Sequence, residues 1–306
     1  MAKLAHKGGG DVCALAAVEG VGLVSGGDTF VCLWARGADR GLQSIAGDKA
    51  RVIAALSDGR FAKVCANTNL VEVWDARAGK RLHQLRGHAA CVQCVAALPG
   101  GLLASGGEDK TVRIWNAATG AHEATLEGHK GWVRALAALP DGRLASSSWD
   151  KTIRLWNVAT RACTRVLQHP SYVHALAVLD GGRLASGCDD NRIHIWCLRG
   201  GAVDAVLGGH TGTVVSLAAL PNGLLASGSG DKTVRVWDVG ARACVAELEG
   251  HGGAVCALAA LPDGRLASSA YGDPLIRVWA LTAPASPEDA AAAAAAARCV
   301  AVAAAP

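Results

Sequence analysis

Aromatic residues are scarce in this chain of 306 residues. They make up 4% of the sequence, and Phe and Tyr occur only twice each, whereas nine Trp are present. A hydrophobic core therefore has to be packed mainly with Ala, Val and Leu around the few large Trp rings.

Long apolar runs are also missing, although hydrophobic residues make up 51% of the chain. Alanine inflates this share, and the apolar runs have the length of β-strands, well short of a membrane span. Residues 1–10 carry basic side chains but no apolar stretch of signal-peptide length. These absences argue against a membrane or secreted protein and predict an intracellular one, in the cytoplasm, the nucleus or both.

A paired metal-binding motif is absent as well. Cys91 and Cys94 form a CxxC, but no second pair follows among the eleven cysteines, and a strand would place the two side chains on opposite faces. The odd number of cysteines, mostly in expected strands, indicates reduced and buried thiols. We predict neither a metal site nor a cofactor.

Basic residues are not concentrated anywhere in the chain. There are 30 Lys and Arg against 26 Asp and Glu, which gives a formal net charge of +4, and the basic residues recur at regular positions. An even spread is typical of a solvated surface, whereas a nucleic-acid footprint needs a cluster or a stripe. Nucleic-acid binding is therefore not expected.

The sequence does contain a ladder of Trp residues. Intervals of 40, 41, 41, 40, 41 and 42 residues separate Trp34, Trp74, Trp115, Trp156, Trp196, Trp237 and Trp279. A period near forty residues indicates a repeat array.

Each repeat has the pattern strand, turn, strand, turn, strand. The fourth copy runs Gly128-His129, VRALAAL, Pro140-Asp141-Gly142, RLASSS and TIRLW, so that segments of period-two character alternate with turn residues. Units this short cannot bury their apolar faces alone, and a closed ring of them removes most free strand edges.

The Gly-His pair, an Asp six residues before the Trp, and copies that end Trp74-Asp75 and Trp237-Asp238 resemble the WD40 repeat family. The resemblance covers residues 2–281, and five copies carry the whole pattern. It implies an all-β fold, a seven-bladed β-propeller with four antiparallel strands per blade, formed by one domain of residues 1–281.

Residues 282–306 form an Ala-rich tail outside the repeats. Eight alanines (290–297) are compatible with either a helix or a disordered segment. Residues 298–302 and residues 3–6 both resemble the outer strand of other copies, and they compete to complete the last blade. We expect the N-terminal segment to close the ring.

The resemblance also implies a structural hydrogen-bonded set in each complete repeat, made of the His before the first strand, a Ser, the turn Asp and the closing Trp. Because the set recurs five times, it is expected to hold the blade rather than to catalyse hydrolysis. The five sets are His88, Ser105, Asp109, Trp115; His129, Ser146, Asp150, Trp156; His169, Ser186, Asp190, Trp196; His210, Ser227, Asp231, Trp237; and His251, Ser268, Asp273, Trp279.

Two repeats depart from this set. The first has His6, Ser25, Asp28 and Trp34 at altered spacing. The second retains only Trp74 and is expected to be the least rigid blade. The positions of its His, Ser and Asp are taken by Asp48, Val64 and Thr68.

By resemblance, three positions per repeat point to one face of the disc. Both Trp outside the ladder and one of the two Tyr fall on these positions in the fourth and fifth repeats, which favours a binding surface, because exposed aromatics beside Arg are typical of interaction hot spots. The alternative is that the rings only cover neighbouring turns. The expected partner-binding residues are Trp132, Arg134, Trp149, Tyr172, His174, Glu108, Asp189, Gln93 and Arg51.

The same positions in the second repeat are assigned to Arg51, Ile53 and Asn67, and the last of them in the seventh repeat to Gly272. Arg134 and Trp149 are expected to be exposed, so that their replacement should leave thermal unfolding nearly unchanged.

A weaker motif ends the second repeat. Trp74-Asp75-Ala76-Arg77 matches the WDxR pattern of propellers that act as substrate receptors of cullin-RING ubiquitin ligases, and Asp75 and Arg77 would contact the adaptor. The simpler interpretation is a strand end with an exposed Arg.

Three functions follow from these patterns. The first is a non-enzymatic scaffold that binds a protein or peptide segment on one face, around the third to fifth repeats. The second is a cullin-RING substrate receptor. The third is an enzyme with its site in the central channel, which is disfavoured because the positions facing it supply no nucleophile, base and stabiliser in defined roles.

Overall fold

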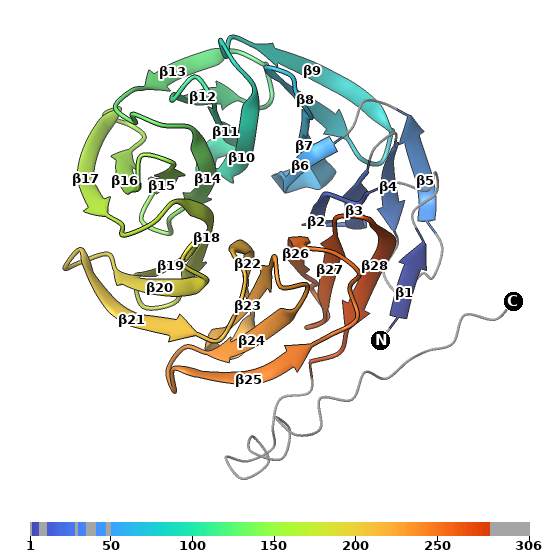
Figure 1. The fold of residues 1–306 in the computed structure, drawn as a ribbon. Helices are drawn as coiled ribbons and strands as arrows, with labels where there is room; N and C mark the ends of the chain where they lie inside the picture. Colours follow the sequence, from blue (N-terminus) through green and yellow to red (C-terminus); the bar gives the residue numbers. More distant parts are fainter. Residues whose placement is uncertain (1, 6–10, 28–29, 35–40, 47–49, 282–306) are drawn as a thin grey trace, which may run out of the picture.

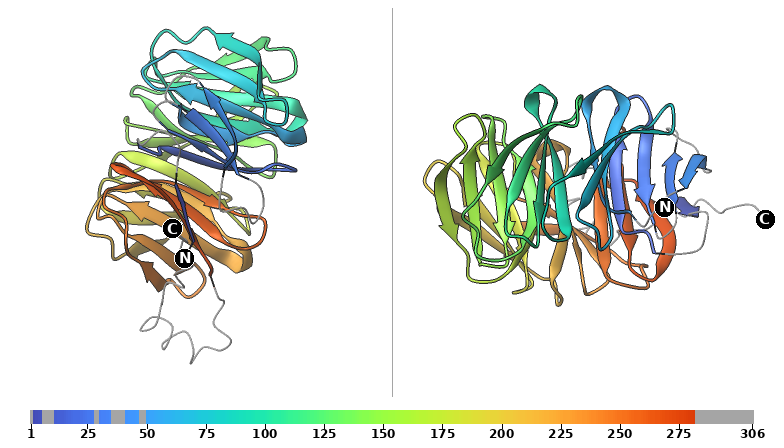
Figure 2. Two further views of the ribbon diagram at one scale, coloured as in Figure 1. Left: turned by 90° about the vertical axis from the view of Figure 1, so that its right-hand side faces the viewer. Right: turned by 90° about the horizontal axis from the view of Figure 1, so that it is seen from above.

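The computed structural model describes residues 2–5, 11–27, 30–34, 41–46 and 50–281. Their strands form seven four-stranded antiparallel sheets, which stand as blades around a central axis (Figure 1). Seen from the edge, the molecule is a disc whose two faces carry the loops between the strands (Figure 2). The predicted all-β, seven-bladed architecture is confirmed.

The first four blades follow the chain in order from the inner to the outer strand. Blade 1 contains β2 (Ala14–Val18), β3 (Gly22–Gly26), β4 (Phe30–Trp34) and β5 (Gly41–Ala46). Blade 2 contains β6 (Ala50–Ala55), β7 (Arg60–Cys65), β8 (Leu70–Asp75) and β9 (Lys80–Arg86). Blade 3 contains β10 (Val92–Leu98), β11 (Leu102–Gly107), β12 (Val112–Asn116) and β13 (His122–Leu126). Blade 4 contains β14 (Val133–Ala138), β15 (Arg143–Ser148), β16 (Thr152–Asn157) and β17 (Ala162–Gln168).

The last three blades continue the same order, except that the outer strand of blade 7 comes from the start of the chain. Blade 5 contains β18 (Val173–Leu179), β19 (Arg183–Cys188), β20 (Arg192–Cys197) and β21 (Ala202–Gly208). Blade 6 contains β22 (Val214–Ala219), β23 (Leu224–Ser229), β24 (Val234–Asp238) and β25 (Ala243–Leu248). Blade 7 contains β26 (Val255–Ala260), β27 (Leu266–Ala270), β28 (Asp273–Trp279) and β1 (Ala2–Ala5).

Helical structure in the described residues is limited to three short 3-10 segments, η1 (Ser57–Gly59), η2 (Pro99–Gly101) and η3 (Pro221–Gly223). Among these residues there is no helix with the length and apolar character that a membrane crossing requires.

The ring is closed by the N-terminal strand, as expected. β1 pairs antiparallel with β28, and Ala2 lies opposite Val278. The Ala-rich tail, residues 282–306, lies outside the described residues, as do His6, Asp28 and Asp48.

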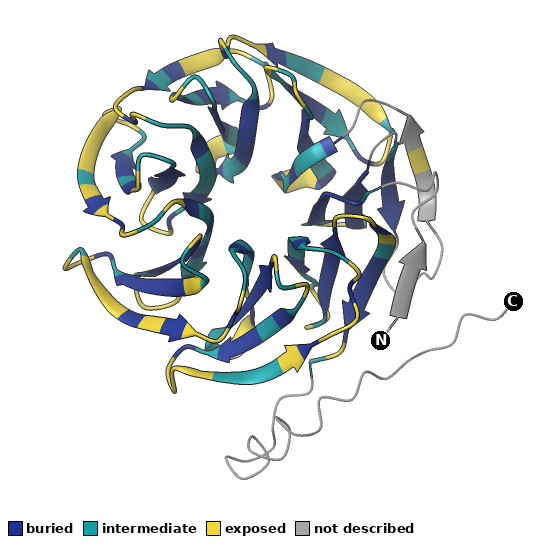
Figure 3. Cartoon of the chain, in the orientation of Figure 1, coloured by how far each residue is buried: buried dark blue, intermediate teal, exposed yellow. Residues whose placement is uncertain are grey.

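The closing Trp of each blade packs into the apolar face of the preceding blade. Trp156 of blade 4, for example, joins a buried cluster with Ile114 and Leu126 of blade 3, and Trp196 of blade 5 joins one with Leu155 of blade 4. The second strands, such as β11, β15 and β19, are consequently buried almost throughout, whereas most residues of the outer strands β17 and β21 are exposed (Figure 3). Because other aromatics are scarce, one buried Trp ring provides much of the apolar contact at each junction between blades.

Blade 4 shows how the four-residue set is bonded. Trp156 Nε1 donates to Ser146 Oγ over 2.8 Å, and His129 lies 2.7 Å from the same hydroxyl through Nε2 and 2.8 Å from Asp150 Oδ2 through Nδ1. Since a carboxylate only accepts, Nδ1 carries the proton, and Nε2 accepts from the Ser hydroxyl. Every polar group of the buried set is thereby satisfied.

The same bonds recur in blades 3 and 6, with His to Asp distances of 2.8 and 2.7 Å. In blade 7 the His251 to Asp273 distance is 3.2 Å, and Arg277 Nη1 lies 2.8 Å from the same His nitrogen and also donates to the carboxylate. In blade 3, burial raises the pKa of Asp109, but the hydrogen bond and charge of His88 and the backbone N–H groups of Ala89 and Thr111 together outweigh it and lower the pKa to about 2. The sets are His88, Ser105, Asp109, Trp115; His210, Ser227, Asp231, Trp237; and His251, Ser268, Asp273, Trp279.

Blade 5 does not form the expected set. Trp196 and His169 both contact Ser186, but the Asp190 carboxylate turns away from His169 and accepts a hydrogen bond from His194 Nε2 over 2.8 Å. His169 Nδ1 lies instead 3.2 Å from the backbone nitrogen of Ser171. The assignment of Asp190 to this set was therefore wrong, because a second His competes for the carboxylate.

Blade 2 replaces the missing set with charged residues that the sequence pattern did not identify. Trp74 Nε1 donates to Glu72 Oε2 over 3.0 Å, Arg81 Nη1 pairs with Oε1 at 2.7 Å, and Lys63 Nζ lies 3.3 Å from Oε2. The Lys63 and Glu72 side chains are only 2% and 6% exposed. Burial raises the pKa of Glu72, but the bond from Arg81 and the charge of Lys63 outweigh it and lower the pKa. In blade 1, Trp34 still donates to Ser25.

Replacement of Asp150 by Ala should destabilise the propeller by about 1–3 kcal/mol, since the His129 N–H and two backbone amides lose a buried acceptor. The free energy of unfolding in urea, followed by Trp fluorescence, measures this. Asp141→Ala is the control, because that carboxylate is 53% exposed and its surface ion pair with Arg143 contributes about 1 kcal/mol or less. Equal effects of the two substitutions would contradict a structural role for the set.

Replacement of Glu72 by Gln should destabilise blade 2 by about 3–5 kcal/mol, because it leaves the Lys63 ammonium buried without its counter-charge. The double variant Lys63→Met with Glu72→Gln should lose less than Glu72→Gln alone, since the unpaired charge is removed. Urea unfolding of the unmodified chain, the two single variants and the double variant gives the coupling free energy. Additive effects would show that the two side chains do not interact.

The free energy of unfolding should fall in two stages as pH decreases. Burial and the charge of Arg277 lower the pKa of His251 to about 4, so the stability from its neutral form is complete above pH 6.5 and is lost toward pH 4. The lowered pKa of Asp109, about 2, adds a loss between pH 4 and 2. Urea midpoints at pH 7.5, 5 and 3 test this, and an unchanged midpoint at pH 5 would contradict the first stage.

Candidate functional site

The predicted face residues lie where the loop before an inner strand meets the loop after the second strand. In blade 4 the Trp149 N–H donates to the Trp132 carbonyl oxygen over 3.0 Å, and in blade 5 the Asp189 N–H donates to the Tyr172 carbonyl oxygen over 3.2 Å. This backbone bond fixes the two loops to each other. Both side chains of each pair are thereby held at the same end of their blade.

Four of these residues form an aromatic cluster across blades 4 and 5. The rings of Trp132 and Trp149 are stacked, with centroids 4.5 Å apart and planes inclined by 15°. Tyr172 and His174 approach Trp149 from blade 5, at centroid distances of 6.1 and 6.4 Å. The predicted aromatics are therefore in mutual contact, and Trp149 is at the centre.

Arg134 connects the aromatic cluster to blade 3. Its guanidinium carbon lies 5.3 Å from the centroid of the Trp149 ring, which is a cation–π distance. Its Nη1 donates to Gln93 Oε1 over 2.5 Å, and Gln93 Nε2 donates to Glu108 Oε1 over 2.7 Å. Gln93 thus orients the guanidinium plane over the ring.

His174 connects the cluster to blade 6. Its Nε2 lies 2.7 Å from Asp189 Oδ1, and the same oxygen accepts a hydrogen bond from Thr213 Oγ1 over 3.2 Å. Burial lowers the pKa of His174 more than the Asp189 carboxylate raises it. The imidazole is therefore neutral at neutral pH and donates from Nε2 to the carboxylate.

We refer to eight of these residues as the blade 3–5 cluster. They are Gln93, Glu108, Trp132, Arg134, Trp149, Tyr172, His174 and Asp189.

Three of the cluster residues are less exposed than expected. Arg134 and Trp149 are half-buried by each other and by their neighbours, and Gln93 is only 4% exposed. Tyr172, by contrast, is 42% exposed. The expected exposure of Arg134 and Trp149 was therefore wrong, and because their replacement removes packing as well as a surface group, we now expect it to lower the stability.

The positions in blade 2 also need correction. Ala50 lies opposite Cys65 just as Val133 lies opposite Ser148, so Arg51 occupies the place next to the axis that Arg134 has in blade 4. Ile53 is 7% exposed and belongs to a core cluster instead of the face. The shift arises because the second repeat has no His to set its alignment.

In blade 7 the third face position belongs to Tyr271, which the sequence pattern missed. The Tyr271 N–H donates to the Ala254 carbonyl oxygen over 2.9 Å, as Trp149 does to Trp132. Gly272, the expected residue, lies one place further and donates to Asp11 Oδ1. One extra residue in this turn, visible as the 42-residue interval between Trp237 and Trp279, is the signal that points to Tyr271.

Cationic side chains approach the axis from two blades. Burial, followed by the charge of Arg51, lowers the pKa of Arg134. Burial raises the pKa of Tyr271, while Arg51 and Arg134 partly offset this, so its hydroxyl lies within electrostatic range of both guanidinium groups. Arg134 Nε has no hydrogen-bond partner among the described residues. The region near the axis therefore favours an anionic group.

Asp75 and Arg77 lie away from this region, at the turn after β8. Asp75 Oδ1 accepts hydrogen bonds from the backbone N–H groups of Arg77 and Ala78, at 2.8 and 2.9 Å. Asn116 forms the same turn in blade 3. The Asp therefore has a local structural role, and adaptor binding stays a prediction.

The Cys256 thiol is not an activated nucleophile. Cys256 contacts Cys13 across the junction of blades 7 and 1, and its hydrogen bond with Cys13, together with burial, raises its pKa well above the usual value. A thiol that is not ionised at neutral pH is a poor nucleophile. Among the described residues, one group of three potential metal ligands occurs, and it lies in blade 5: His169, Cys188 and His194.

Comparison with known proteins agrees with this architecture. No curated protein matches the chain. The solved structure described as "Crystal structure of WD40 beta propeller domain of Doa1" is similar in fold, with a TM-score of 0.82 and 23% sequence identity, over 92% of this chain and 96% of that one.

The family model described as "WD domain, G-beta repeat" matches residues 79–116, 120–157, 161–197, 201–238 and 242–280. Propellers with this repeat are generally non-enzymatic scaffolds for protein interactions. Because the matched repeats make up more than half of the sequence, the chain belongs to the WD40 repeat family.

Proposed function

We propose that this propeller is a scaffold that binds a peptide or protein segment over the blade 3–5 cluster, on the face around the axis. The observation that carries the proposal is the stack of Arg134 on Trp149, with Trp132, Tyr172 and His174 around the same ring. Rigid aromatic side chains beside a preorganised guanidinium are typical of interaction hot spots.

The aromatic part supplies an apolar anchor. Trp149 packs between rings from two blades, so its position is fixed before a partner arrives and little conformational entropy is lost on binding. Tyr172 is 42% exposed and Lys151 Nζ lies 5.3 Å from its ring centroid, so this end of the cluster is open to a side chain of the partner.

The charged part sets the polarity of the segment. Arg51 and Arg134 favour an acidic side chain or a phosphate near the axis, whereas Glu108 and Asp189 lie on blades 3 and 5 at either side of Arg134. A segment with an acidic group next to an aromatic or aliphatic residue matches this order. Such a partner needs no cofactor.

A narrower function, as a substrate receptor of a cullin-RING ligase, rests on the identity of Asp75 and Arg77 alone. Asp75 forms the same turn as Asn116, and no contact in the described residues favours the receptor role over that of a turn residue. Arg77→Ala tests adaptor binding in the same experiment as the main proposal.

The test is a comparative pull-down from cell lysate, quantified by mass spectrometry, with the full chain as bait. Arg51→Gln/Arg134→Gln removes both charges but leaves an amide opposite Gln93, and Trp132→Ala/Tyr172→Ala removes two rings. We expect each double variant to recover at least tenfold less of the specific partners than the unmodified chain does, which corresponds to about 1.4 kcal/mol of binding free energy. Each bait is first shown to unfold cooperatively.

The matched control is Val203→Ala/Val206→Ala on the outer strand β21, where these side chains are 42% and 46% exposed on the edge of blade 5. It should retain every partner. The proposal is wrong if both cluster variants keep the partners of the unmodified chain. Loss of ubiquitin-ligase subunits with Arg77→Ala alone would favour the receptor function.

A further inference from the structure

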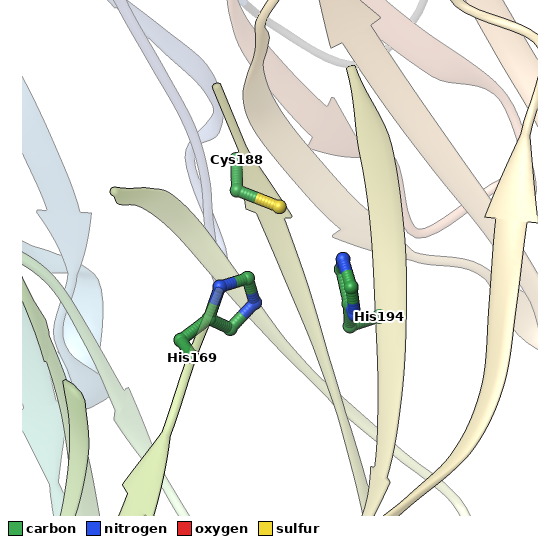
Figure 4. Close-up of side chains that lie close together, drawn as sticks. All are labelled: His169, Cys188 and His194. Carbon is green, nitrogen blue, oxygen red and sulfur yellow. The ribbon is translucent and has the colours of Figure 1, made fainter. Parts of the chain in front are cut away.

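Blade 5 contains a buried group of three side chains with metal-ligating atoms. His169 precedes β18, Cys188 ends β19 and His194 lies in β20, and one ligating atom of each lies within 4.8 Å of the other two. Their exposed fractions are 5%, 0% and 6%. Figure 4 shows the three side chains converging on one region between the strands.

Two of these residues set blade 5 apart from the other complete repeats. His194 lies opposite Ser186, a position that Arg occupies in the four other complete blades. Cys188 ends the second strand where blades 4 and 6 have Ser148 and Ser229. The four arginines are Arg113, Arg154, Arg235 and Arg277.

The substitutions also redirect Asp190. Its Oδ2 is 2.8 Å from His194 Nε2, and its Oδ1 is 2.9 Å from Cys188 Sγ. The carboxylate therefore bridges two of the three ligating residues and leaves the structural bond to His169 that its counterparts make. Blade 5 has exchanged part of its hydrogen-bonded set for a compact group of two imidazoles and one thiol, with a carboxylate bonded to two of the three.

We propose that His169, Cys188 and His194 bind Zn²⁺, with the Asp190 carboxylate as the fourth ligand. Two imidazoles, one thiolate and one carboxylate are donors that zinc accepts in tetrahedral sites. Bonds of about 2.0–2.3 Å separate neighbouring ligand atoms by about 3.3–3.8 Å, so the three donors have to move together by at most about 1.5 Å. Rotation of the side chains is sufficient for such a movement.

The protonation states are compatible with metal binding. Burial and the charge of His194 lower the pKa of His169 to about 4, so the ring is neutral at pH 7 and can ligate a metal ion once the nitrogen that binds the ion gives up its contact with Ser186 or Ser171. Burial and Asp190 raise the pKa of Cys188, which is a thiol before the ion arrives. The charge of a bound zinc ion reverses this balance, because a coordinating thiol is deprotonated and its proton is released to solvent.

The role of such a site is structural. It lies inside one blade, between the first three strands, and all three ligating side chains are buried, so a substrate has no access to an open coordination position. Zinc would join β18, β19 and β20 at the place where the other blades use the His to Asp hydrogen bond. The ion therefore substitutes for a missing polar link.

The test uses the full chain, stripped of metal with a chelator and dialysed. Titration calorimetry with ZnCl₂ and elemental analysis should give one tightly bound zinc per chain, and zinc should raise the temperature of thermal unfolding. Cobalt in place of zinc should produce a thiolate-to-metal charge-transfer absorption in the near ultraviolet. That absorption reports Cys coordination directly.

Cys188→Ser/His194→Arg installs the residues of blade 4 in blade 5 and frees Asp190 for His169, so the variant is expected to fold. It should bind zinc at least 100-fold more weakly and lose the cobalt absorption. Cys197→Ser, in β20 of the same blade, is the matched control and should bind as the unmodified chain does.

Three results would overturn the proposal. The first is the absence of stoichiometric zinc binding by the metal-free chain. The second is retention of zinc and of the cobalt absorption by Cys188→Ser/His194→Arg. The third is selective binding of copper without zinc, which would assign the three ligands to a different metal.

Discussion

The insertion of one Trp into the face of the preceding blade is the contact on which this fold depends. Each blade is too thin to form a core of its own, and the Trp indole fills the space between two neighbouring sheets while its N–H is bound to the blade that carries it. The same side chain therefore contributes to packing between blades and to hydrogen bonding within a blade. In a chain with so few other aromatics, these Trp rings are the largest side chains in the contacts between blades, where Ala, Val, Leu and Ile fill the remaining space.

The hydrogen-bonded sets show that the acceptor of the Trp indole N–H can be provided by different residue types, although its position in the blade stays the same. Blade 4 uses a Ser and a His, whereas blade 2 uses Glu72 with Lys63 and Arg81, and in both the indole N–H finds an acceptor. What the position demands is a buried acceptor whose own partners are satisfied. In blade 5 the Trp196 indole also has a Ser acceptor, but Asp190 is bonded to His194 instead of His169.

The Trp period, together with the resemblance to WD40 repeats that it supports, was sufficient to predict the seven blades and the closure of the ring by the N-terminal segment. It failed where a repeat lost its markers or changed its length. Arg51 was placed two positions out of register because its repeat has no His, and Tyr271 was missed because one extra residue precedes its turn Asp. The contacts around Arg134 were beyond prediction for a different reason. Gln93 and Trp149 come from different blades, and sequence spacing does not reveal which rotamers meet between blades.

Ring closure by β1 gives the molecule a particular history during synthesis. Ala2 and Val278 are paired although more than 270 residues separate them in the sequence. At about 5–20 residues per second, β1 leaves the ribosome on the order of 15–60 s before its partner strand exists. The first blade meanwhile exposes the apolar face that blade 7 later covers with the residues around Ala267 and Ile276. The growing chain is thus an open arc of blades with an exposed apolar face at each end. These faces can associate with other chains until the last blade folds and closes the ring.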